Sequence, residues 1–537
     1  MTTACEVLVV GAGPVGLTLA NLLGQQGVDV LVVEREHELV DYPRAVGIDD
    51  EALRTMQTAG LVDEVLPHTI PDQKIYMVNG DRTILCEVNP TTREFGWPRR
   101  NGFVQPLVDQ VLLAGLDRFP NAGARFGAEV VDLTEDTDGV VATLADGGTV
   151  RARYVVAAEG GSSPTRKRLG ISFEGETRPT DGIVIDVAND PIGTPHAVFG
   201  GDPARSYASI ALPHGIRRWE FTLFEDESAD LVDDDAYVFG LLAPHVPDPA
   251  RLDIIRRRVY RHHARIAGRF RHGRIFLAGD AAHVMPVVGG QGWNSGIRDA
   301  FNLGWKLAAV VKGPAGDGLL DTYETERLGH VTQMVAVSLG MAKEWTDHDP
   351  VKAAERDRIA ANRTPQERQA QERQAFKPQP KFEQGVVVHT PLPKFKTLPA
   401  RDVPSLAGSL FPQPPATDTN GVQMLLDDAT GQGWRVITWN NDPRVFLSAQ
   451  RLAVADRLGA RLVRVVPKAQ LPWAREHTAP GVTVVGDLGG EASLQAWFDA
   501  RPVGAVIVRP DHVIAAECLA QELDDVLGKV LETAHIA

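Results

Sequence analysis

Cysteine is scarce in this sequence, which has only Cys5, Cys86 and Cys518 among 537 residues. They form no C-x-x-C pair and no metal-ligand spacing, and their number is odd, which argues against a disulfide framework or a cysteine-built zinc site. No cluster of histidines and cysteines has ligand spacing either, so we expect no metal. Scattered reduced thiols are typical of a cytosolic protein.

Positive charge is also in deficit. Lys and Arg number 55 against 70 Asp and Glu, which gives a formal net charge of −15. Nucleic acid is therefore not expected as the main partner, because phosphate binding needs a basic face. Acidic small substrates stay open, since they need only one or two local arginines.

Long apolar runs are missing as well. The run at residues 7–10 is too short to span a bilayer, and the N-terminus lacks the basic segment and small-residue cleavage site of a signal peptide. We therefore expect no membrane association and a cytoplasmic location. The composition, 43% hydrophobic and 23% charged, is ordinary for a globular protein, and the length predicts about three domains.

The first 33 residues follow a βαβ pattern. Residues 6–10 form a short β-branched run that ends at Gly11, residues 14–26 have helical periodicity up to Gly27, and residues 28–33 predict a second strand. Such a unit is typical of a doubly wound parallel sheet.

The middle of the chain changes pattern twice. Strand-like segments such as 206–212 and 219–224 alternate with polar turns between about 172 and 270, which predicts an antiparallel sheet in a second domain. Residues 275–278 then predict a return to the first domain, and residues 294–311 predict a helix. The segment 343–400, rich in Lys, Arg, Glu, Gln and Pro, predicts a solvated helix and a linker. A further α/β module follows.

Gly11, Gly13 and Gly16 fit the pattern G-x-G-x-x-G directly after the first strand. The first glycine permits the tight turn, the second lets the backbone approach a pyrophosphate, and the third lets the helix pack against the strand. Glu34 ends the second strand, where a carboxylate accepts hydrogen bonds from a ribose diol. Strand, helix and Glu34 together predict a bound dinucleotide.

A second segment, Leu277-Ala-Gly-Asp280, distinguishes FAD from NAD. Asp280 follows a strand and is placed to bind ribityl hydroxyls, and the glycines Gly289, Gly290 and Gly292 lead into a helix whose N-terminus favours negative charge. We therefore predict that one FAD is held both by the opening loop and by this distant turn.

With these motifs the chain resembles the single-component FAD-dependent aromatic hydroxylases, the class of para-hydroxybenzoate hydroxylase. The further matches are Arg44 in Tyr-Pro-Arg-Ala, Gln105 in Phe-Val-Gln-Pro and Glu159-Gly160, where the family usually has Asp-Gly. Segments 41–56, 94–101, 187–196, 211–221 and 291–296 resemble more narrowly the 3-(3-hydroxyphenyl)propionate/3-hydroxycinnamate hydroxylases. That resemblance implies a homodimer and a C-terminal thioredoxin-like domain without redox cysteines.

The expected fold is α/β: a Rossmann-like doubly wound FAD-binding sheet, an antiparallel-sheet α+β substrate domain and the thioredoxin-like domain. We place the FAD-binding domain at 1–72, 106–171 and 271–342, the substrate domain at 73–105 and 172–270, the charged region at 343–400 and the last domain at 401–537.

The resemblance also implies the reaction. NADH or NADPH reduces FAD, O2 adds to form a flavin C4a-hydroperoxide, and one oxygen enters a phenolic acid ortho to its hydroxyl. The implied cofactor contacts are Gly11, Gly13, Pro14, Val15, Gly16, Glu34, Arg35, Arg44, Gln105, Gly160, Gly279, Asp280, Pro286, Gly292, Trp293 and Asn294. Arg44, Pro286, Gly289 and Gly290 would position the reacting groups without a covalent role.

The substrate contacts stay open. His214, Arg217 and Arg218 lie on the predicted substrate sheet, and one of these arginines, or Arg99 or Arg100, is expected to pair with a substrate carboxylate. His283 is interpreted as structural rather than as a base. The alternatives are the same chemistry on a simple phenol, a resorcinol or a polyketide, a flavin dehydrogenase or reductase without oxygen insertion, and a non-catalytic flavin protein.

Overall fold

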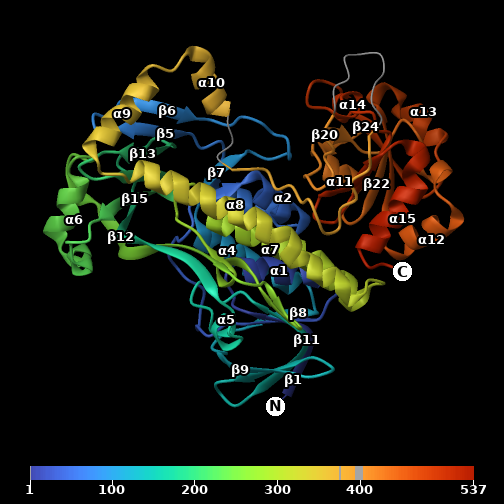
Figure 1. Ribbon diagram of the computed structural model, residues 1–537, viewed down its shortest axis with the longest axis horizontal. Coiled ribbons are helices and arrows are strands. Elements are labelled where there is room, and N and C mark those ends of the chain that lie inside the picture. Colours follow the sequence, from blue (N-terminus) through green and yellow to red (C-terminus); the bar gives the residue numbers. More distant parts are fainter. Residues whose placement is uncertain (1, 374–376, 393–402) are drawn as a thin grey trace.

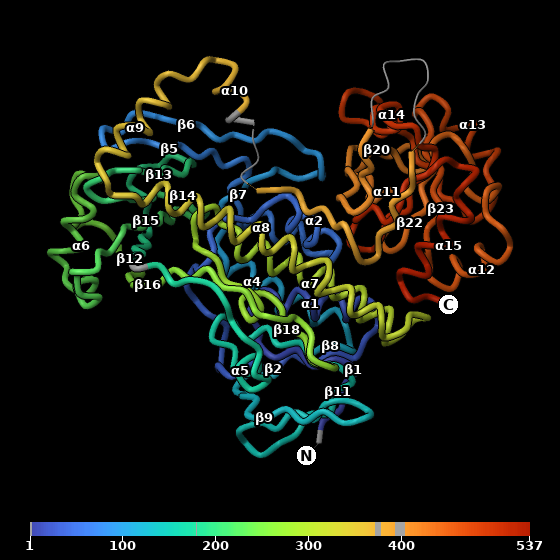
Figure 2. Tube along the Cα trace, in the orientation of Figure 1, coloured from blue at the N-terminus to red at the C-terminus, as the bar shows by residue number. Residues whose placement is uncertain are grey.

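The computed structural model describes residues 2–373, 377–392 and 403–537. In it, five parallel strands form the core of the sheet that the βαβ pattern predicts. Their spatial order is β18 (Ile275–Leu277), β11 (Thr149–Ala157), β1 (Thr2–Val10), β2 (Val30–Val33) and β8 (Ala122–Arg125). In Figure 2 these strands gather in the lower part of the molecule, although β18 comes some 265 residues after β1. The sheet thus collects distant segments of the chain, and the α/β prediction is confirmed.

The two faces of this sheet are covered differently. Helices α1 (Pro14–Gln25), α4 (Gln105–Ala114) and α7 (Gln291–Lys312) pack on the face of Val7 and Val9. The antiparallel strands β9 (Val130–Glu135) and β10 (Val140–Leu144) extend from β11 and cover the face of Leu8 and Val10. Since β1 is buried on both faces, its run is continuously apolar, as expected for a central parallel strand.

A second, eight-stranded sheet confirms the predicted antiparallel region. Its order is β19 (His283–Val284), β16 (Asp253–Ala267), β12 (Phe173–Ala188), β15 (Ile216–Leu223), β14 (Tyr207–Leu212), β13 (Ala197–Gly201), β5 (Ile75–Asn79) and β6 (Ile84–Val88). Only the pairing of β13 with β5 is parallel. A small third sheet has the order β3 (Gly47–Asp49), β7 (Arg100–Phe103) and β4 (Thr69–Ile70). It carries residues of the site.

The C-terminal part is a separate α/β layer, at the right of Figure 1. Its seven strands have the order β21 (Gln423–Leu425), β20 (Pro415–Thr417), β24 (Val482–Asp487), β23 (Arg461–Pro467), β22 (Arg435–Trp439), β25 (Ala505–Val508) and β26 (Ile514–Cys518). Helices α11 (Leu426–Thr430), α12 (Ala449–Arg457), α13 (Leu471–Glu476), α14 (Leu494–Asp499) and α15 (Leu523–Thr533) accompany them. The detailed thioredoxin-like assignment stays a prediction.

The remaining helices connect these parts. They are α2 (Asp50–Thr58), α3 (Val62–Val65), α5 (Pro164–Arg168), α6 (Asp235–Leu242), α8 (Asp321–Trp345), α9 (Pro350–Ala361) and α10 (Pro365–Arg373). In Figure 1 the long helix α8 crosses the molecule from beside the C-terminal part towards α9. No helix in the described ranges has the length and apolar composition needed to cross a bilayer.

The charged region 343–400 is more than an exposed linker in its described part. Helices α9 and α10 carry mostly exposed side chains, as predicted, but Lys377 and Val386 are buried. Residues 374–376 and 393–400 of this prediction lie outside the described residues. The domain boundaries themselves stay predictions.

Candidate active site

The glycine loop lies at the carboxyl end of β1, where the parallel sheet meets the start of α1. Gly11 has φ +110°, and a Cβ there would lie 2.5 Å from the carbonyl oxygen of Ala158. A Cβ on Gly16 would lie 2.1 Å from the carbonyl oxygen of Gly11. Both positions therefore require glycine for the close approach of backbone segments.

Gly13 differs from these two glycines. A Cβ built there meets no protein atom within 4 Å, and the residue lines a cavity of about 970 Å³. It is also the N-cap of α1, whose first free N–H groups face outward from this point. The absence of a side chain at Gly13 thus leaves room for a ligand rather than for the protein, as a pyrophosphate at a helix N-terminus requires.

Glu34 closes the same loop. Its Oε2 accepts a hydrogen bond from the backbone N–H of Ala12 at 2.8 Å, and its Oε1 accepts one from the N–H of Glu36 at 3.0 Å. The carboxylate lines the cavity and is half-buried, beside exposed Arg35. Its position at the end of β2 is the one that ribose recognition needs.

The distant acidic turn lies directly against this loop. Gly279 has φ +60°, and a Cβ on it would lie 2.8 Å from Cγ2 of Val15. Asp280, the next residue, lines the cavity, and no described residue forms a hydrogen bond with its carboxylate. The structure therefore brings together the two segments that the sequence analysis paired, with an uncommitted carboxylate facing the shared space.

A third turn joins them at the end of β11. Arg166 donates to the carbonyl oxygens of Gly161 and Ala281, each at 2.7 Å, and so ties this turn to the acidic turn. Glu159, in place of the family's aspartate, accepts hydrogen bonds from Ser163 Oγ at 2.6 Å and Thr165 Oγ1 at 3.0 Å at the start of α5. The longer acid is thus used to hold a helix, while Gly160, with φ +80°, lines the cavity.

The start of α7 forms another wall. Pro286, Gly289, Gly290, Gly292 and Trp293 line the cavity, and Gly290, with φ +65°, is the N-cap of α7. The helix begins at Gln291, three residues earlier than predicted. Asn294 does not line the main cavity. It donates to the carbonyl oxygens of Gly47 (3.0 Å) and Gly290 (2.7 Å), so it fastens the helix start to β3.

Arg44 and Gln105 line another part of the cavity. Gln105 Oε1 accepts the N–H of Ala45 at 2.8 Å, and Gln105 Nε2 donates to Asp109 Oδ2 at 3.0 Å. Arg44 itself is exposed and lines the cavity. Gln105 thus positions the Arg44 segment through its backbone.

Asp109 was missed by the sequence analysis. It is 4% exposed, it lines the cavity, and its Oδ1 has no hydrogen-bond partner among the described residues. Burial raises its pKa to about 7, although the hydrogen bond from Gln105 and the charge of Arg44 act in the other direction. The i,i+4 spacing from Gln105 on one helix was the available signal.

The second sheet supplies an apolar wall. Its register aligns Met77, Phe199 and Ala208 across three neighbouring strands, and Ile75 and Ile210 follow two residues away on the same face. Ile75, Met77, Phe199 and Ile210 all line the cavity. A flat aromatic ring is the kind of ligand that such a wall accommodates.

Glu220 lies in the same row, opposite Ala208, and was also missed. Burial raises the pKa of its carboxyl group, against the charge of Arg218 and a hydrogen bond from Tyr260. The Tyr260 hydroxyl donates to Oε2 at 3.2 Å. The cavity thus contains a buried acid beside an apolar surface, an arrangement suited to proton transfer.

The arginines expected on the substrate sheet are already paired. Arg217 donates to both oxygens of Asp190, at 2.6 and 2.8 Å, and Arg218 donates to both oxygens of Asp186, at 2.7 and 2.9 Å. Arg218 also donates to the carbonyl oxygen of Arg44 at 3.0 Å and so supports that loop. Neither arginine lines the main cavity.

Two other candidate substrate residues also lie away from it. His214 is exposed and lies 3.1 Å from a ring nitrogen of His68. Arg99 lines a separate cavity of about 30 Å³. Arg100, its neighbour, lines both cavities.

His283 is fully buried behind the acidic turn. Its Nε2 lies 2.6 Å from Asp299 Oδ2, and Arg327 Nε donates to the other oxygen of Asp299 at 2.7 Å. Burial raises the pKa of Asp299, but His283 and Arg327 outweigh it and lower that pKa to about 2. This geometry supports the structural interpretation of His283.

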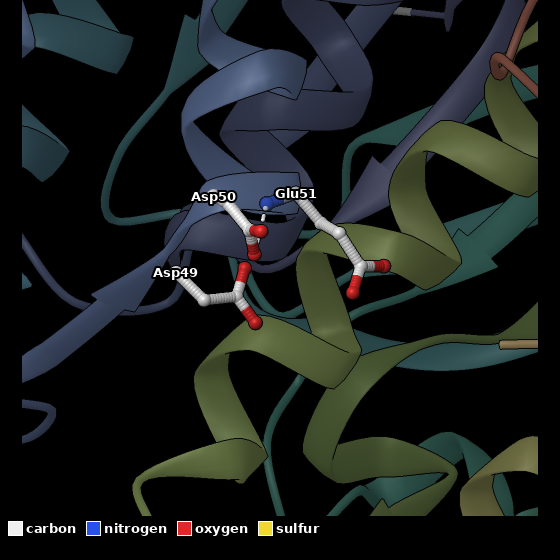
Figure 3. A group of neighbouring side chains, drawn as sticks. All are labelled: Asp49, Asp50 and Glu51. Carbon is white, nitrogen blue, oxygen red and sulfur yellow. Dashed lines mark hydrogen bonds between the residues drawn. The ribbon is translucent and has the colours of Figure 1, made fainter. Parts of the chain in front are cut away.

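A buried acidic cluster at the start of α2 has the spacing of a metal site. Figure 3 shows Asp49, Asp50 and Glu51, whose carboxylate oxygens approach one another within 4.8 Å. Lys377 Nζ contacts all three, at 2.6, 3.1 and 2.6 Å, and Arg298 pairs with Asp49 and Glu51. Two protein cations therefore already occupy the position between the three carboxylates, and we assign no metal here.

The cavity fits FAD in three independent respects. Gly13 leaves open space at a helix N-terminus. Within the described ranges, Asp280 lines the cavity without a partner, and Asp109 keeps an unbonded buried oxygen. Glu34 adds a carboxylate at the ribose position. All of these residues line the same cavity.

Comparisons with known proteins agree with this geometry. Residues 4–338 match the model of a family described as "FAD binding domain", and residues 408–533 match one described as "HcaD C-terminal domain". A 3-(3-hydroxy-phenyl)propionate/3-hydroxycinnamic acid hydroxylase of Mycobacterium sp. (strain JLS) is 48% identical, covering 99% of this chain and 93% of the relative. One of Escherichia coli O8 (strain IAI1) is 43% identical, with 98% and 94% covered.

Solved structures extend the likeness over the whole fold. Aklavinone-11 hydroxylase, in a ternary complex with FAD and aklavinone, is 28% identical with a TM-score of 0.74, covering 98% of this chain and 99% of that one. The flavin-dependent monooxygenase PieE, with a TM-score of 0.79, 23% identity and 99% of both chains covered, shares the fold. The chain belongs to the FAD-binding family of aromatic hydroxylases.

Proposed function

We propose that this chain is an NADH-consuming monooxygenase that hydroxylates a phenolic acid ortho to its hydroxyl, with 3-(3-hydroxyphenyl)propionate as the leading substrate. One observation carries the proposal: a single cavity joins the glycine loop and Asp280 to the apolar wall of the second sheet. The names and the 43–49% identity of full-length relatives support the substrate. A homodimer and a cytoplasmic location belong to the same proposal.

The chain's residues have distinct tasks in this reaction. FAD, when bound, supplies the electron transfer from NADH and the activation of O2. The Gly11–Gly16 loop and the α1 N-terminus bind its pyrophosphate, Glu34 its ribose and Asp280 its ribityl chain. The apolar wall orients the ring and excludes water, and the exclusion of water limits side reactions of the activated oxygen. The wall consists of Ile75, Met77, Phe199 and Ile210.

Glu220 accepts the phenol proton in this proposal. Its carboxylate lies on the wall where the ring would rest, and its raised pKa makes it a stronger base than an exposed glutamate. Proton removal gives the ring phenolate character, which activates its ortho and para carbons, and the way the wall holds the ring then selects the ortho position.

The test is a coupled assay on the purified holoenzyme. With 3-(3-hydroxyphenyl)propionate or 3-hydroxycinnamate, we expect one molecule of hydroxylated product for each NADH that is oxidised. With phenol or resorcinol, we expect less product for each NADH. NADPH in the same assay tests the choice of reductant. NADH oxidation without hydroxylated product would identify a reductase instead.

A polyketide-type substrate is the second candidate. The full-length likeness to aklavinone-11 hydroxylase, in a complex with FAD and aklavinone, is the observation behind it. An anthracycline aglycone in the same panel decides between them, because preferred turnover of that compound contradicts the phenolic-acid assignment.

A further inference from the structure

Arg100 occupies a junction between the cavity and the apolar wall. It begins β7 opposite Asp49 of β3, and its side chain lines the main cavity beside Gly47 and Gly289. Its carbonyl oxygen accepts the N–H of Gln73 at 3.1 Å, and the Gln73 side chain donates to Ala211 of β14 at 2.7 Å. Arg100 is thus fixed to the strand that carries Ile210.

The guanidinium of Arg100 has no partner in the described part of the chain. No carboxylate lies within ion-pair distance, no acceptor takes a hydrogen bond from it, and its Nε is shut off from solvent. Burial lowers its pKa to about 10, and no described carboxylate acts against this shift. A desolvated cation without a partner is costly, so its retention points to a ligand that provides the counter-charge.

The other arginines around the site are not available in this way. Arg217 and Arg218 each hold a carboxylate, and Arg44 is exposed to solvent. Arg99 lies outside the main cavity, close enough to Asp50 to stabilise its charge. Arg100 alone among these five combines a cavity position with partial burial and an uncommitted guanidinium.

We propose that Arg100 binds the carboxylate of the substrate and sets the preference for phenolic acids over neutral phenols. This inference rests on the proposed function and names the residue that determines its substrate class. A guanidinium fork matches a carboxylate in a bidentate geometry, whereas the apolar wall of the same cavity would hold the ring. Strand β7 thereby provides the anchor for the carboxylate, and strands β5, β13 and β14 provide the site for the ring.

The experiment compares two ligands on the flavin-loaded protein without NADH. The acid is 3-(3-hydroxyphenyl)propionate, and the neutral analogue is 3-propylphenol, which keeps the ring and chain but lacks the carboxylate. Dissociation constants are read from the perturbation of the flavin absorbance. We expect Arg100→Met to weaken binding of the acid about 10- to 100-fold and to change binding of 3-propylphenol less than threefold.

Arg100→Lys provides the second variant. A lysine keeps the charge but loses the planar fork, so we expect an intermediate loss for the acid and again none for the neutral phenol. In turnover, the loss should appear in KM more than in kcat, because the carboxylate is held equally before and during the reaction.

The outcomes separate the two levels of the proposal. If Arg100→Met keeps the wild-type ratio of acid to neutral affinity, or if Arg99→Met abolishes that ratio instead, the assignment of Arg100 is overturned. If the wild-type protein neither binds nor hydroxylates the acid while it turns over another aromatic compound, the proposed function fails before Arg100 is tested. If Arg100→Met loses its flavin, the ratio of acid to neutral affinity in Arg100→Lys decides whether Arg100 binds the carboxylate.

Discussion

The cavity and the contact of helices α2 and α8 with the C-terminal α/β layer both hold charged groups, yet they pair them differently. At the contact, Arg54 donates to both oxygens of Asp427, at 2.7 and 3.0 Å, and Arg509 donates to both oxygens of Glu326, at 2.7 and 2.8 Å. In the cavity, the Arg100 guanidinium has no counter-charge in the part of the chain that the structure describes.

This difference separates structural from functional charge. A buried pair that satisfies itself fixes how two parts of the chain dock, and it leaves nothing for a ligand. A half-satisfied group is costly in the free protein and gains its partner only on binding. The pairing state of a buried charge is therefore more informative here than its residue type.

The largest effect is expected from closing the open space at Gly13. Gly13→Val should weaken FAD binding by more than ~10⁴-fold, over about 5 kcal/mol, because the side chain occupies the pyrophosphate position. The measurement is the flavin content of the purified protein and its uptake on reconstitution. Gly123→Val is the matched control, since a Cβ at Gly123 also meets no atom within 4 Å but the residue does not line the cavity. Normal flavin retention by Gly13→Val contradicts the placement.

The next prediction compares buried Lys377 with half-buried Arg100. Among the described residues, Lys377→Met leaves Asp49 and Glu51 with Arg298 as their cation in contact and Asp50 with none. We expect it to lower the free energy of unfolding by about 3–5 kcal/mol. Arg100→Met removes a charge without a partner, so the stability of the flavin-free protein should be unchanged or slightly higher. Denaturant unfolding of both variants measures the difference. Equal losses in the two would remove the distinction between the regions.

The sequence was sufficient for the parts of the site that depend on backbone geometry. The spacing of Gly11, Gly13 and Gly16 and the Gly279-Asp280 turn follow local rules, so the loop, α1 and the pairing of both segments were predictable. The parallel sheet and the antiparallel second sheet also followed from strand periodicity.

Side-chain partners were not predictable from the sequence. Arg217 and Arg218 carry no local sign that Asp190 and Asp186 neutralise them, because those aspartates belong to another part of the chain. Lys377 similarly pairs with an acidic cluster more than 300 residues away. Glu220 and Asp109 emerged only when the register and the cavity were known.

The third prediction removes the uncommitted carboxylate of the acidic turn. Asp280→Ala should weaken FAD binding about 30- to 100-fold, roughly 2–3 kcal/mol, because hydrogen bonds to a charged acceptor are lost. Fluorescence titration of the flavin-free protein measures the affinity. Asp280→Asn keeps one acceptor oxygen and should recover part of it. Wild-type affinity in Asp280→Ala would place Asp280 among the structural charges instead.

The smallest effect concerns Glu220, whose charge is set by several neighbours. Arg218, Asp186, Arg256 and Tyr260 surround the carboxyl, and burial raises its pKa above the usual value. A base must be ionised to accept a proton, so kcat/KM should rise with pH through this raised pKa. Glu220→Gln should abolish that acidic limb and lower kcat/KM at pH 8 roughly tenfold, about 1.4 kcal/mol.

Tyr260→Phe gives the sign test for the same group. The Tyr260 hydroxyl donates to Glu220 Oε2 and thereby lowers the pKa of the carboxyl, so its removal should move the acidic limb to higher pH while the plateau changes little. Rate profiles between pH 5 and 9 measure both variants, with substrate dissociation constants as the control for binding. If Glu220→Gln keeps the acidic limb, another group causes the limb and Glu220 is a structural acid. The contrast between paired and unpaired charges would then rest on Arg100 and the flavin ligands alone.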